Sequence, residues 1–215
     1  MNATEIDQLA RSFPKRWTRH YVAAKLKSDP LYEAVLAELD GSSLPLLDLG
    51  CGVGLLAFYL RDSGCAFPIR SFDYDGGKIV EANRLAAQRG DEQLDFAEHD
   101  ARKGLPEHAG NVTILDILQF FSLDEMRELL VAAAQRVTPG GKLIMRSGLR
   151  DSSWRFRITV AGDLLAKLTF WMKAAPTAYP TADFLRETLE PYGRVRIEPL
   201  WGSTPFNNHL IVLET

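Results

Sequence analysis

Cysteine and histidine are scarce in this sequence, and long apolar runs are missing from it. The 215 residues include two cysteines, Cys51 and Cys65, which are too few for a disulfide framework. The four histidines stand at positions 20, 99, 108 and 209, a spacing that fits no common metal site. No uncharged apolar run approaches the roughly 20 residues that a membrane span needs, and residues 1–20 are too polar for a signal peptide. We therefore expect a cytoplasmic protein that holds no metal and has no membrane span.

A strong excess of charge of either sign is absent as well. The formal net charge is −3, which argues against a general nucleic-acid binder. Hydrophobic residues make up 46% of the chain and charged residues 25%, as in an ordinary globular protein. A chain of this length can bury a full hydrophobic core, so we expect residues 1–215 to form a single domain.

The most informative stretch is a glycine-rich turn between two apolar segments. The run from Leu44 to Leu49 predicts a buried parallel strand, and residues 55–60 predict a buried helix. Between them, glycine stands at every second position, at Gly50, Gly52 and Gly54. Glycine permits positive φ and lets a ligand approach the backbone, because it carries no Cβ. A strand, a glycine turn and a helix N-terminus in this order indicate a nucleotide-type binding site.

A carboxylate ends the next expected strand. Residues 67–72 predict that strand, and Asp73 follows it, 25 residues after Asp48 and near the roughly 20 expected within one βαβ unit. A carboxylate here can accept two hydrogen bonds from a ribose diol. The stretch Gly52 to Ala57 also fits the glycine pattern of dinucleotide-binding folds. This acid therefore predicts a ribose site and disfavours NADP. It does not distinguish a dinucleotide from other ligands that contain ribose.

Further motifs follow in a fixed order. The expected third strand, 94–98, leads to Asp100, and the expected fourth, 112–118, contains Asp116. A capped amphipathic helix and a Pro-Gly-Gly turn then precede a fifth strand, 142–145. Taken together with the acid in the glycine turn, this series resembles the class I S-adenosylmethionine (SAM) methyltransferases. A dinucleotide enzyme has no comparable need for an acid after the third strand.

The resemblance implies a fold and a cofactor. The fold would be an α/β, Rossmann-like, doubly wound sheet of seven mostly parallel strands in the order 3-2-1-4-5-7-6, with strand 7 antiparallel and helices on both faces. Residues 1–42 would form an N-terminal helical lid, 43–147 the SAM-binding core, and 148–215 the substrate-side helices and a C-terminal strand pair. The cofactor would be SAM, with S-adenosylhomocysteine (SAH) as its product. The residues expected to bind it are Asp48, Gly50, Cys51, Gly52, Gly54, Asp73 (ribose), Tyr74, Asp100 (adenine), Ala101, Asp116 and Ile117.

The N-terminal segment is basic and aromatic. Between Arg11 and Lys27 there are six Lys or Arg residues and no acid. Phe13, Trp17 and Tyr21 recur at a spacing of four, which would place them on one helix face. This face either packs on the core or covers the cofactor pocket.

The last seventy residues should determine the acceptor. Arg146, Arg150, Arg155 and Arg157 form either a solvated set with partners such as Asp151 or a cationic rim for an anionic substrate. An amphipathic helix follows, through Val160, Leu164, Leu165, Leu168, Trp171 and Met172, which packs as core or roofs a substrate tunnel. The loop 201–208 is rich in aromatic and amide side chains.

The predicted reaction is methyl transfer from SAM to an O, N or C nucleophile of a small or carrier-protein-bound organic acid. The candidates for a catalytic base are His20, Tyr21 and Asp151, and the candidates for substrate binding are Gln119, Arg150, Trp154, Arg155 and Asn208. Residues 116–119 lack the Pro-Pro tetrad of enzymes that methylate nucleic-acid bases or protein amides. The whole chain also looks similar to bacterial methyltransferases associated with aryl polyene and fatty-acid-like biosynthesis.

Two other functions remain open from the sequence. One is an NAD-dependent oxidoreductase, favoured by the glycine pattern and Asp73 but lacking a recognisable catalytic pair. The other is a SAM-binding regulatory subunit without catalysis. The sequence predicts no oligomeric state.

Overall fold

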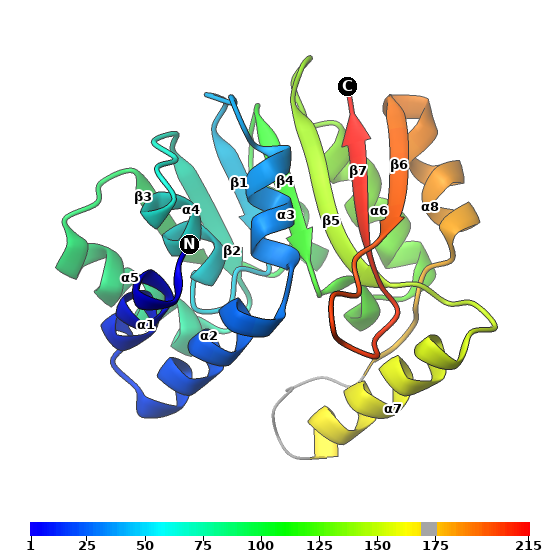
Figure 1. Cartoon of the computed structure of the whole chain (residues 1–215). Helices are drawn as coiled ribbons and strands as arrows, with labels where there is room; N and C mark the ends of the chain where they lie inside the picture. The colour runs from blue at the N-terminus through cyan, green and yellow to red at the C-terminus, as the bar shows by residue number, and fades with distance from the viewer. Residues whose placement is uncertain (169–175) are drawn as a thin grey trace.

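The protein is built on one seven-stranded sheet (Figure 1). The computed structural model describes residues 1–168 and 176–215, without the side chains of 164–168. The strand order is β3-β2-β1-β4-β5-β7-β6, and β7 runs antiparallel to both of its neighbours, which confirms the predicted fold class. The strands are β1 Leu46–Leu49, β2 Ile69–Asp73, β3 Leu94–Glu98, β4 Asn111–Leu115, β5 Lys142–Gly148, β6 Arg194–Pro199 and β7 Asn208–Glu214.

Helices cover both faces of the sheet (Figure 1). The helices are α1 Ala3–Ser12, α2 Arg16–Ser28, α3 Leu31–Glu38, α4 Leu55–Asp62, α5 Gly76–Arg89, α6 Leu123–Ala134, α7 Trp154–Leu168 and α8 Ala182–Leu189, with short 3₁₀ turns at Ala101–Lys103 (η1), Leu118–Phe120 (η2) and Glu190–Tyr192 (η3). Successive strand residues point to opposite faces, so Leu46 joins the apolar cluster under α1 to α5, and Leu47 joins the cluster under α6 and α8. None of the helices described is long and apolar enough to cross a bilayer.

The strand order reverses at β1, which lies between β2 and β4. Crossovers therefore leave the sheet in opposite directions from this point, and the loops at the carboxyl ends of β1, β2 and β4 border a common crevice. Open α/β sheets bind their ligands at such a switch point.

Three expectations from the sequence need correction. Phe13, Trp17 and Tyr21 do not share one helix, because α1 ends at Ser12 and α2 begins at Arg16, on either side of Pro14. Phe13 is fully buried edge-on against a core phenylalanine, whereas Trp17 is 65% exposed.

Strand β4 is shorter than predicted, and α7 is longer toward its N-terminus. β4 ends at Leu115 because Asp116 adopts a left-handed conformation, with φ of 59°, and turns the chain into η2. α7 begins at Trp154, six residues before the expected Val160. The expected contribution of Leu164, Leu165, Leu168, Trp171 and Met172 to its apolar face lies outside the described side chains.

Candidate functional site

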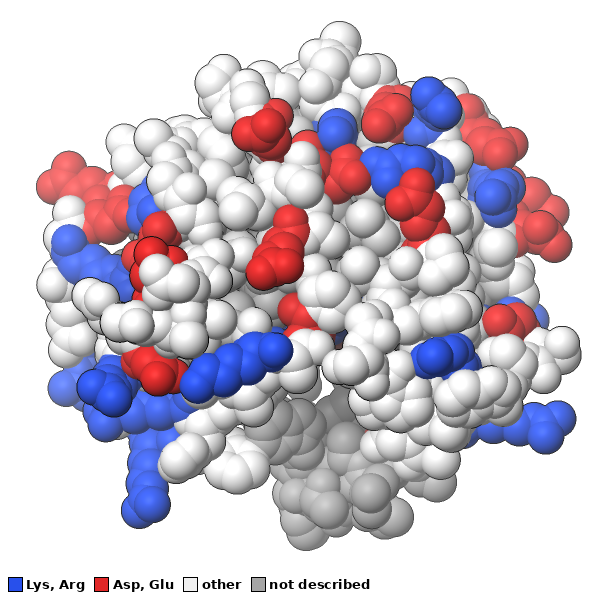
Figure 2. Space-filling view, in the orientation of Figure 1, with Lys and Arg blue, Asp and Glu red and all other residues white. Residues whose placement is uncertain are grey.

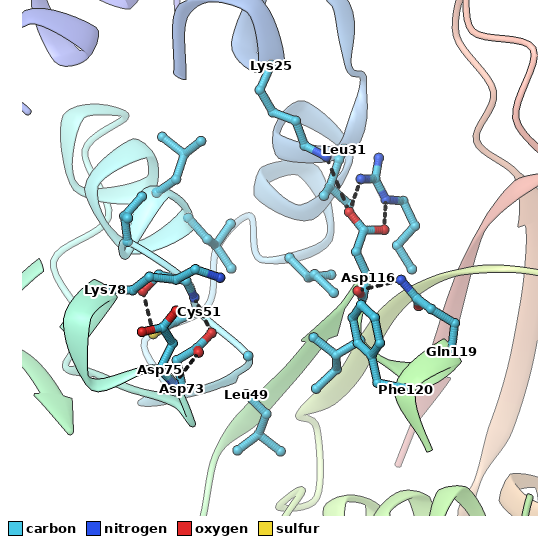
Figure 3. Close-up of a pocket in the computed structure, with 18 of the residues that line it drawn as sticks. Lys25, Leu31, Leu49, Cys51, Asp73, Asp75, Lys78, Asp116, Gln119 and Phe120 are labelled. Atoms are coloured by element: carbon cyan, nitrogen blue, oxygen red, sulfur yellow. Dashed lines mark hydrogen bonds and ion pairs between the residues drawn. The ribbon is translucent and has the colours of Figure 1, made fainter. Parts of the chain in front are cut away.

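A cavity of about 850 Å³ opens at the carboxyl ends of the parallel strands. Its described walls come from the glycine turn, from the loops after β2, β3 and β4, from the inner face of α2, and from α7 with the segment that follows it. Figure 3 shows Asp73, Cys51 and Lys78 on one side of the cavity and Asp116, Gln119 and Phe120 on the other.

The glycine turn leaves its backbone bare toward the cavity. A Cβ on Gly54 would come within 2.5 Å of the Phe96 ring, so only glycine fits between the turn and the core there. Gly52 has φ of 58°, and a Cβ on it would meet nothing within 4 Å. Because Gly52 lines the cavity, its open side is where a ligand can approach the chain most closely.

Asp73 clamps this turn and still faces the cavity. One of its carboxylate oxygens accepts a hydrogen bond from the Gly52 N–H and the other accepts one from the Asp75 N–H, both at 2.8 Å. The side chain is buried at the end of β2 and lines the cavity. A carboxylate has about four acceptor positions, so each oxygen keeps one for a ligand hydroxyl.

Asp48 is a buried carboxylate with only half of its hydrogen bonds made. Its Oδ1 accepts a hydrogen bond from the Thr113 hydroxyl at 2.8 Å, whereas its Oδ2 has no partner among the described residues. Burial raises the pKa of Asp48 to about 7; the Thr113 hydrogen bond opposes this rise, and the negative charge of Asp73 adds to it. A cationic ligand group in the cavity would supply the missing partner.

The neighbouring Cys51 is also buried beside the cavity, and burial raises the pKa of its thiol well above the usual value. The thiol is therefore neutral at pH 7. This agrees with a side chain that packs in the turn rather than one that reacts.

The loop after β3 forms another part of the wall. Asp100 and Ala101 both line the cavity, and one oxygen of Asp100 accepts hydrogen bonds from the backbone N–H and the guanidinium of Arg102. Tyr74, 48% exposed, lines the same end. Ile117 lies against Gly50, where a Cβ would come within 2.5 Å of the isoleucine side chain. The structure thus brings all the expected cofactor residues except the tightly packed Gly54 to the cavity wall.

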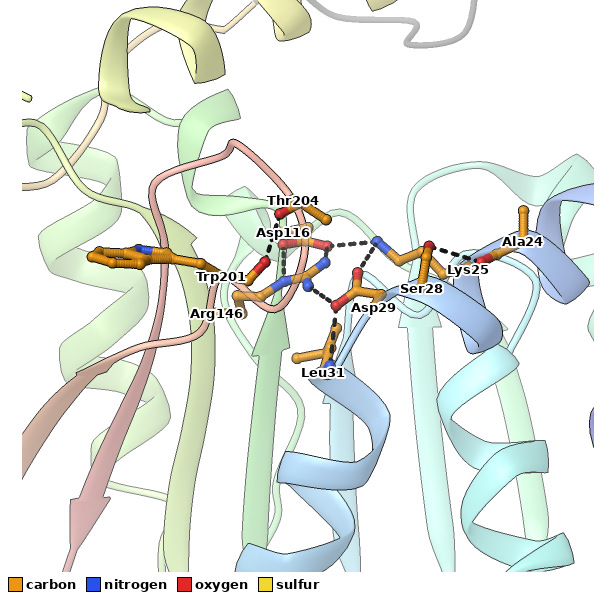
Figure 4. Close-up of polar contacts among 9 residues, drawn as sticks. All are labelled: Ala24, Lys25, Ser28, Asp29, Leu31, Asp116, Arg146, Trp201 and Thr204. Carbon is orange, nitrogen blue, oxygen red and sulfur yellow. Dashed lines mark hydrogen bonds and ion pairs between the residues drawn. The ribbon is translucent and has the colours of Figure 1, made fainter. Parts of the chain in front are cut away.

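Four charged side chains, which we call the charged cluster, join the N-terminal helices to the sheet (Figure 4): Lys25, Asp29, Asp116 and Arg146. The Arg146 guanidinium donates to both oxygens of Asp116 and to Asp29, and it is 2% exposed. The Lys25 ammonium lies 3.0 Å from Asp29 and 3.3 Å from Asp116. All four line the cavity.

The two cations of the charged cluster keep its two carboxylates ionised. Burial alone would raise the pKa of Asp116, but the charges of Arg146 and Lys25 outweigh it and hold that pKa well below the usual range. The pKa of Asp29 is lowered in the same way, with Arg146 and Lys25 outweighing burial. All four groups are therefore ionised at neutral pH. Arg146, which the sequence placed either in a solvated set or in a cationic rim, is engaged inside the protein.

The other expected substrate and catalytic residues divide into two groups. Tyr21, Gln119 and Asn208 line the cavity. Residues outside its described lining are His20, Arg150, Asp151, Trp154 and Arg155.

Local contacts explain why the C-terminal group lies elsewhere. The Asp151 carboxylate accepts hydrogen bonds from the Ser153 N–H and the Asn207 amide. The Arg155 guanidinium lies 4.9 Å from the Trp154 ring and 4.3 Å from the Trp201 ring. The loop 201–208 is thus held partly by a cation–π stack, and Arg155 is not directed at the cavity.

Sequence reasoning missed several charged or polar side chains in this cavity, among them Lys25, Asp29, Asp163 and Tyr179. Lys25 and Asp29 stand four apart at the end of α2, a spacing that indicates an ion pair. Their link to Asp116 and Arg146 spans about ninety to 120 residues, for which no local pattern exists. Tyr179 and Asp163 form a further pair, in which the tyrosine hydroxyl donates to the carboxylate at 2.7 Å.

An open, mostly parallel sheet with a bare glycine turn after β1 and acids after β2 and β3 is typical of proteins that bind a nucleotide-type ligand at the switch point. The family described as a methyltransferase domain matches residues 47–143 of the chain. This match covers 97 of the 215 residues and identifies a methyltransferase domain in that part of the chain.

Two proteins named as methyltransferases are similar to this chain, one in sequence and one in structure. Ubiquinone biosynthesis O-methyltransferase of Xanthomonas axonopodis pv. citri (strain 306) is 28% identical over 140 residues, which cover 63% of this chain and 56% of that protein. The chain thus spans little more than half the length of the curated relative. The magnesium protoporphyrin IX methyltransferase ChlM of Synechocystis PCC 6803, crystallised with SAH, has a TM-score of 0.67 at 19% identity, covering 100% of this chain and 96% of ChlM.

The fold likeness also extends beyond enzymes named as methyltransferases. The [4+2]-cyclase SpnF has a TM-score of 0.61 at 22% identity, covering 80% of this chain and 61% of SpnF. The fold alone therefore does not establish methyl transfer.

Proposed function

We propose that the protein transfers the methyl group of SAM to an O, N or C nucleophile of a small or carrier-protein-bound organic acid and releases SAH. The observation that carries this proposal is the grouping of Asp48, Asp73 and Asp100 around the bare backbone of Gly52. The unpartnered oxygen of buried Asp48 supports it further, because the α-ammonium of SAM is a cation of the required kind.

Each part of the site has a separate task in binding. The turn around Gly52 would hold the methionine portion, with Asp48 facing its ammonium. Asp73 would accept hydrogen bonds from the ribose hydroxyls, and Asp100 and Ala101 would bind adenine. When bound, SAM supplies a methyl group already activated by the positive charge on sulfur. The protein mainly has to align the acceptor and exclude water, and good alignment contributes on the order of 7–11 kcal/mol.

The N-terminal segment, residues 1–42, would act as the lid over the core at 43–147. This assignment is supported by α2, whose side chains Trp17, Tyr21 and Lys25 line the cavity at a spacing of four. The charged cluster fastens the end of α2 to β5. Residues 148–215 would supply the acceptor side.

A carrier protein in the cytoplasm is a suitable bearer of the substrate. Basic side chains gather over α1 and α2 at the lower left of Figure 2, in the segment that has six Lys or Arg residues and no acid between positions 11 and 27. An acidic carrier surface would complement this region.

Calorimetry with SAM, SAH and NAD tests the proposed function. We expect SAM and SAH to bind and NAD not to bind. Asp73→Ala should weaken SAM binding by about 1–3 kcal/mol, because the ribose hydroxyls lose charge-assisted hydrogen bonds. Asp95→Ala is the matched control, since that acid lies on β3, is exposed and pairs only with Arg70 among the described residues.

Three results would contradict parts of the proposed function. Tight NAD binding without SAM binding would favour an oxidoreductase. Unchanged SAM affinity in Asp73→Ala would remove the ribose assignment. SAM binding without methyl transfer to any acceptor would favour the second candidate, a SAM-binding protein without methyltransferase activity. The fold shared with a protein named as a cyclase makes this candidate worth testing.

A further inference from the structure

We propose that Asp163 accepts the proton of a hydroxyl group on the methyl acceptor and that Tyr179 is the positioning residue that orients Asp163. This inference rests on the proposed function and adds to it the acceptor atom, an oxygen that carries a proton. Both side chains line the cavity, on α7 and on the segment before α8.

The pair is held by contacts with α7 and with the end of β5. The Tyr179 hydroxyl donates to Asp163 Oδ2 at 2.7 Å, and its ring packs edge-on against Phe156 with ring centres 5.3 Å apart. The ring also lies beside Gly148, where an added Cβ would be 3.8 Å from it. Gly148 ends β5, so Tyr179 stands over the carboxyl end of that strand. Among the contacts of the described residues, none engages the second oxygen of Asp163, Oδ1, which remains for a ligand.

The position of the pair separates it from the cofactor residues. Asp48, Asp73 and Asp100 belong to β1, β2 and the loop after β3, whereas Tyr179 lies beside β5, on the other side of β4. The segment that carries Tyr179 is fixed to the loop after β4, because the Thr177 N–H donates to the Gln119 carbonyl at 2.7 Å. The pair therefore faces the acceptor half of the same cavity.

Charge favours a hydroxyl over a free carboxylate at this position. Two cations of the described wall, Lys25 and Arg146, are engaged by Asp29 and Asp116 in the charged cluster. Asp163 presents a carboxylate, which would repel an anion and accept a hydrogen bond from a hydroxyl. A carrier-bound organic acid meets this requirement for a hydroxyl without a free carboxylate. Its acyl carboxyl group is esterified, so it carries no charge, and its hydroxyl can enter the cavity.

The charged and titratable groups that act on Asp163 among the described residues are Tyr179 and Asp116. Burial raises the pKa of Asp163, the Tyr179 hydrogen bond opposes that rise, and the charge of Asp116 adds to it. A carboxylate with a raised pKa is a stronger base, which suits proton removal from a hydroxyl.

Methyl transfer from SAM to the acceptor hydroxyl needs no further reactant. The acceptor oxygen forms a bond to the methyl carbon as the carbon–sulfur bond breaks, and that electron pair stays on sulfur, which becomes the neutral thioether of SAH. The hydroxyl proton passes to Asp163 and then to water.

The test compares Asp163→Asn and Tyr179→Phe with the wild type, using phenol, catechol and 4-hydroxybenzoate methyl ester as acceptors and benzoate as a probe without a hydroxyl. We expect methylation of at least one phenolic probe and none of benzoate. Asp163→Asn should lower kcat by about 10²–10⁴-fold. Asp183→Asn is the matched control, because that carboxylate is exposed on α8 outside the cavity lining.

Two further readouts separate a chemical role from a structural one. SAH affinity and the melting temperature should be unchanged in Asp163→Asn. In Tyr179→Phe, the acid limb of kcat/KM should move to higher pH, because loss of the hydrogen bond raises the pKa of Asp163. A structural role alone would not move that limb.

The outcomes that overturn the inference are distinct from those that overturn the proposed function. Wild-type kcat in Asp163→Asn, or methylation of benzoate but of no phenol, contradicts the role of Asp163. SAM binding without methylation of any phenolic probe contradicts the hydroxyl assignment. Absence of SAM binding removes the proposed function itself.

Discussion

Replacing Arg146 with alanine is expected to destabilise the protein by about 3–5 kcal/mol. The guanidinium is 2% exposed and binds two carboxylates, Asp29 and Asp116. Without it, both acids remain beside each other with only the Lys25 ammonium as a nearby cation among the described residues. Removal of one partner from this largely buried cluster leaves negative charge that the Lys25 ammonium compensates only in part.

The pH dependence of this loss identifies its cause. The folded-state pKa values of Asp29 and Asp116 lie below their unfolded values, so their stabilising effect is present above about pH 4 and is lost as the pH falls. The deficit of Arg146→Ala should therefore be largest near pH 7 and shrink below about pH 4.

Urea unfolding at the two pH values measures this deficit. Arg186→Ala is the control, since the side chain of that arginine on α8 is 43% exposed and pairs with Glu190 at 4.0 Å; it should cost at most about 1 kcal/mol. If Arg146→Ala lost no more free energy of unfolding than Arg186→Ala does, that result would contradict the structural role of the charged cluster.

Asp48→Asn is expected to stabilise the ligand-free protein at pH 8 and to weaken its binding of SAM. The folded-state pKa of about 7 lies above the unfolded value, so ionisation of Asp48 costs folding free energy, and this cost grows as the pH rises from about 4 to 7. Asparagine keeps an acceptor for the Thr113 hydroxyl and carries no charge. The gain at pH 8 should be about 2–4 kcal/mol.

The same substitution should reduce SAM affinity by about 10–100-fold, because the α-ammonium loses its charged partner. In the wild type, affinity should rise between pH 6 and 7.5 as Asp48 ionises, and this rise should disappear in Asp48→Asn. Calorimetry at the two pH values and urea unfolding at pH 8 measure both effects. A variant that is less stable than the wild type yet binds SAM equally well would contradict both the buried charge and its assignment to the ammonium.

The cofactor half of the fold could be predicted because its signals are local. Apolar runs, the glycine turn and strand-end acids each lie within a few residues, and parallel strands bring their carboxyl ends together. The sequence alone could therefore assign Asp48, Asp73 and Asp100 to one site. The strand 94–98 was predicted at its observed bounds for the same reason.

The acceptor half depends on contacts between distant segments. Arg146 looked like part of an arginine-rich surface, and only the fold reveals that Asp29, 117 residues away, and Asp116 bind it. β4 ends just before Asp116 because that residue has a positive φ, and the periodicity of the sequence does not predict a positive φ at an aspartate. The Tyr179–Asp163 pair likewise joins two segments with no shared motif.

A crystal structure of the protein with SAH tests the central claim most directly. We expect the adenosyl group to lie over the Gly50–Gly54 turn, with its ribose hydroxyls on Asp73, its adenine beside Asp100 and its ammonium facing Asp48. Density for SAH at any other place on the protein would contradict the account.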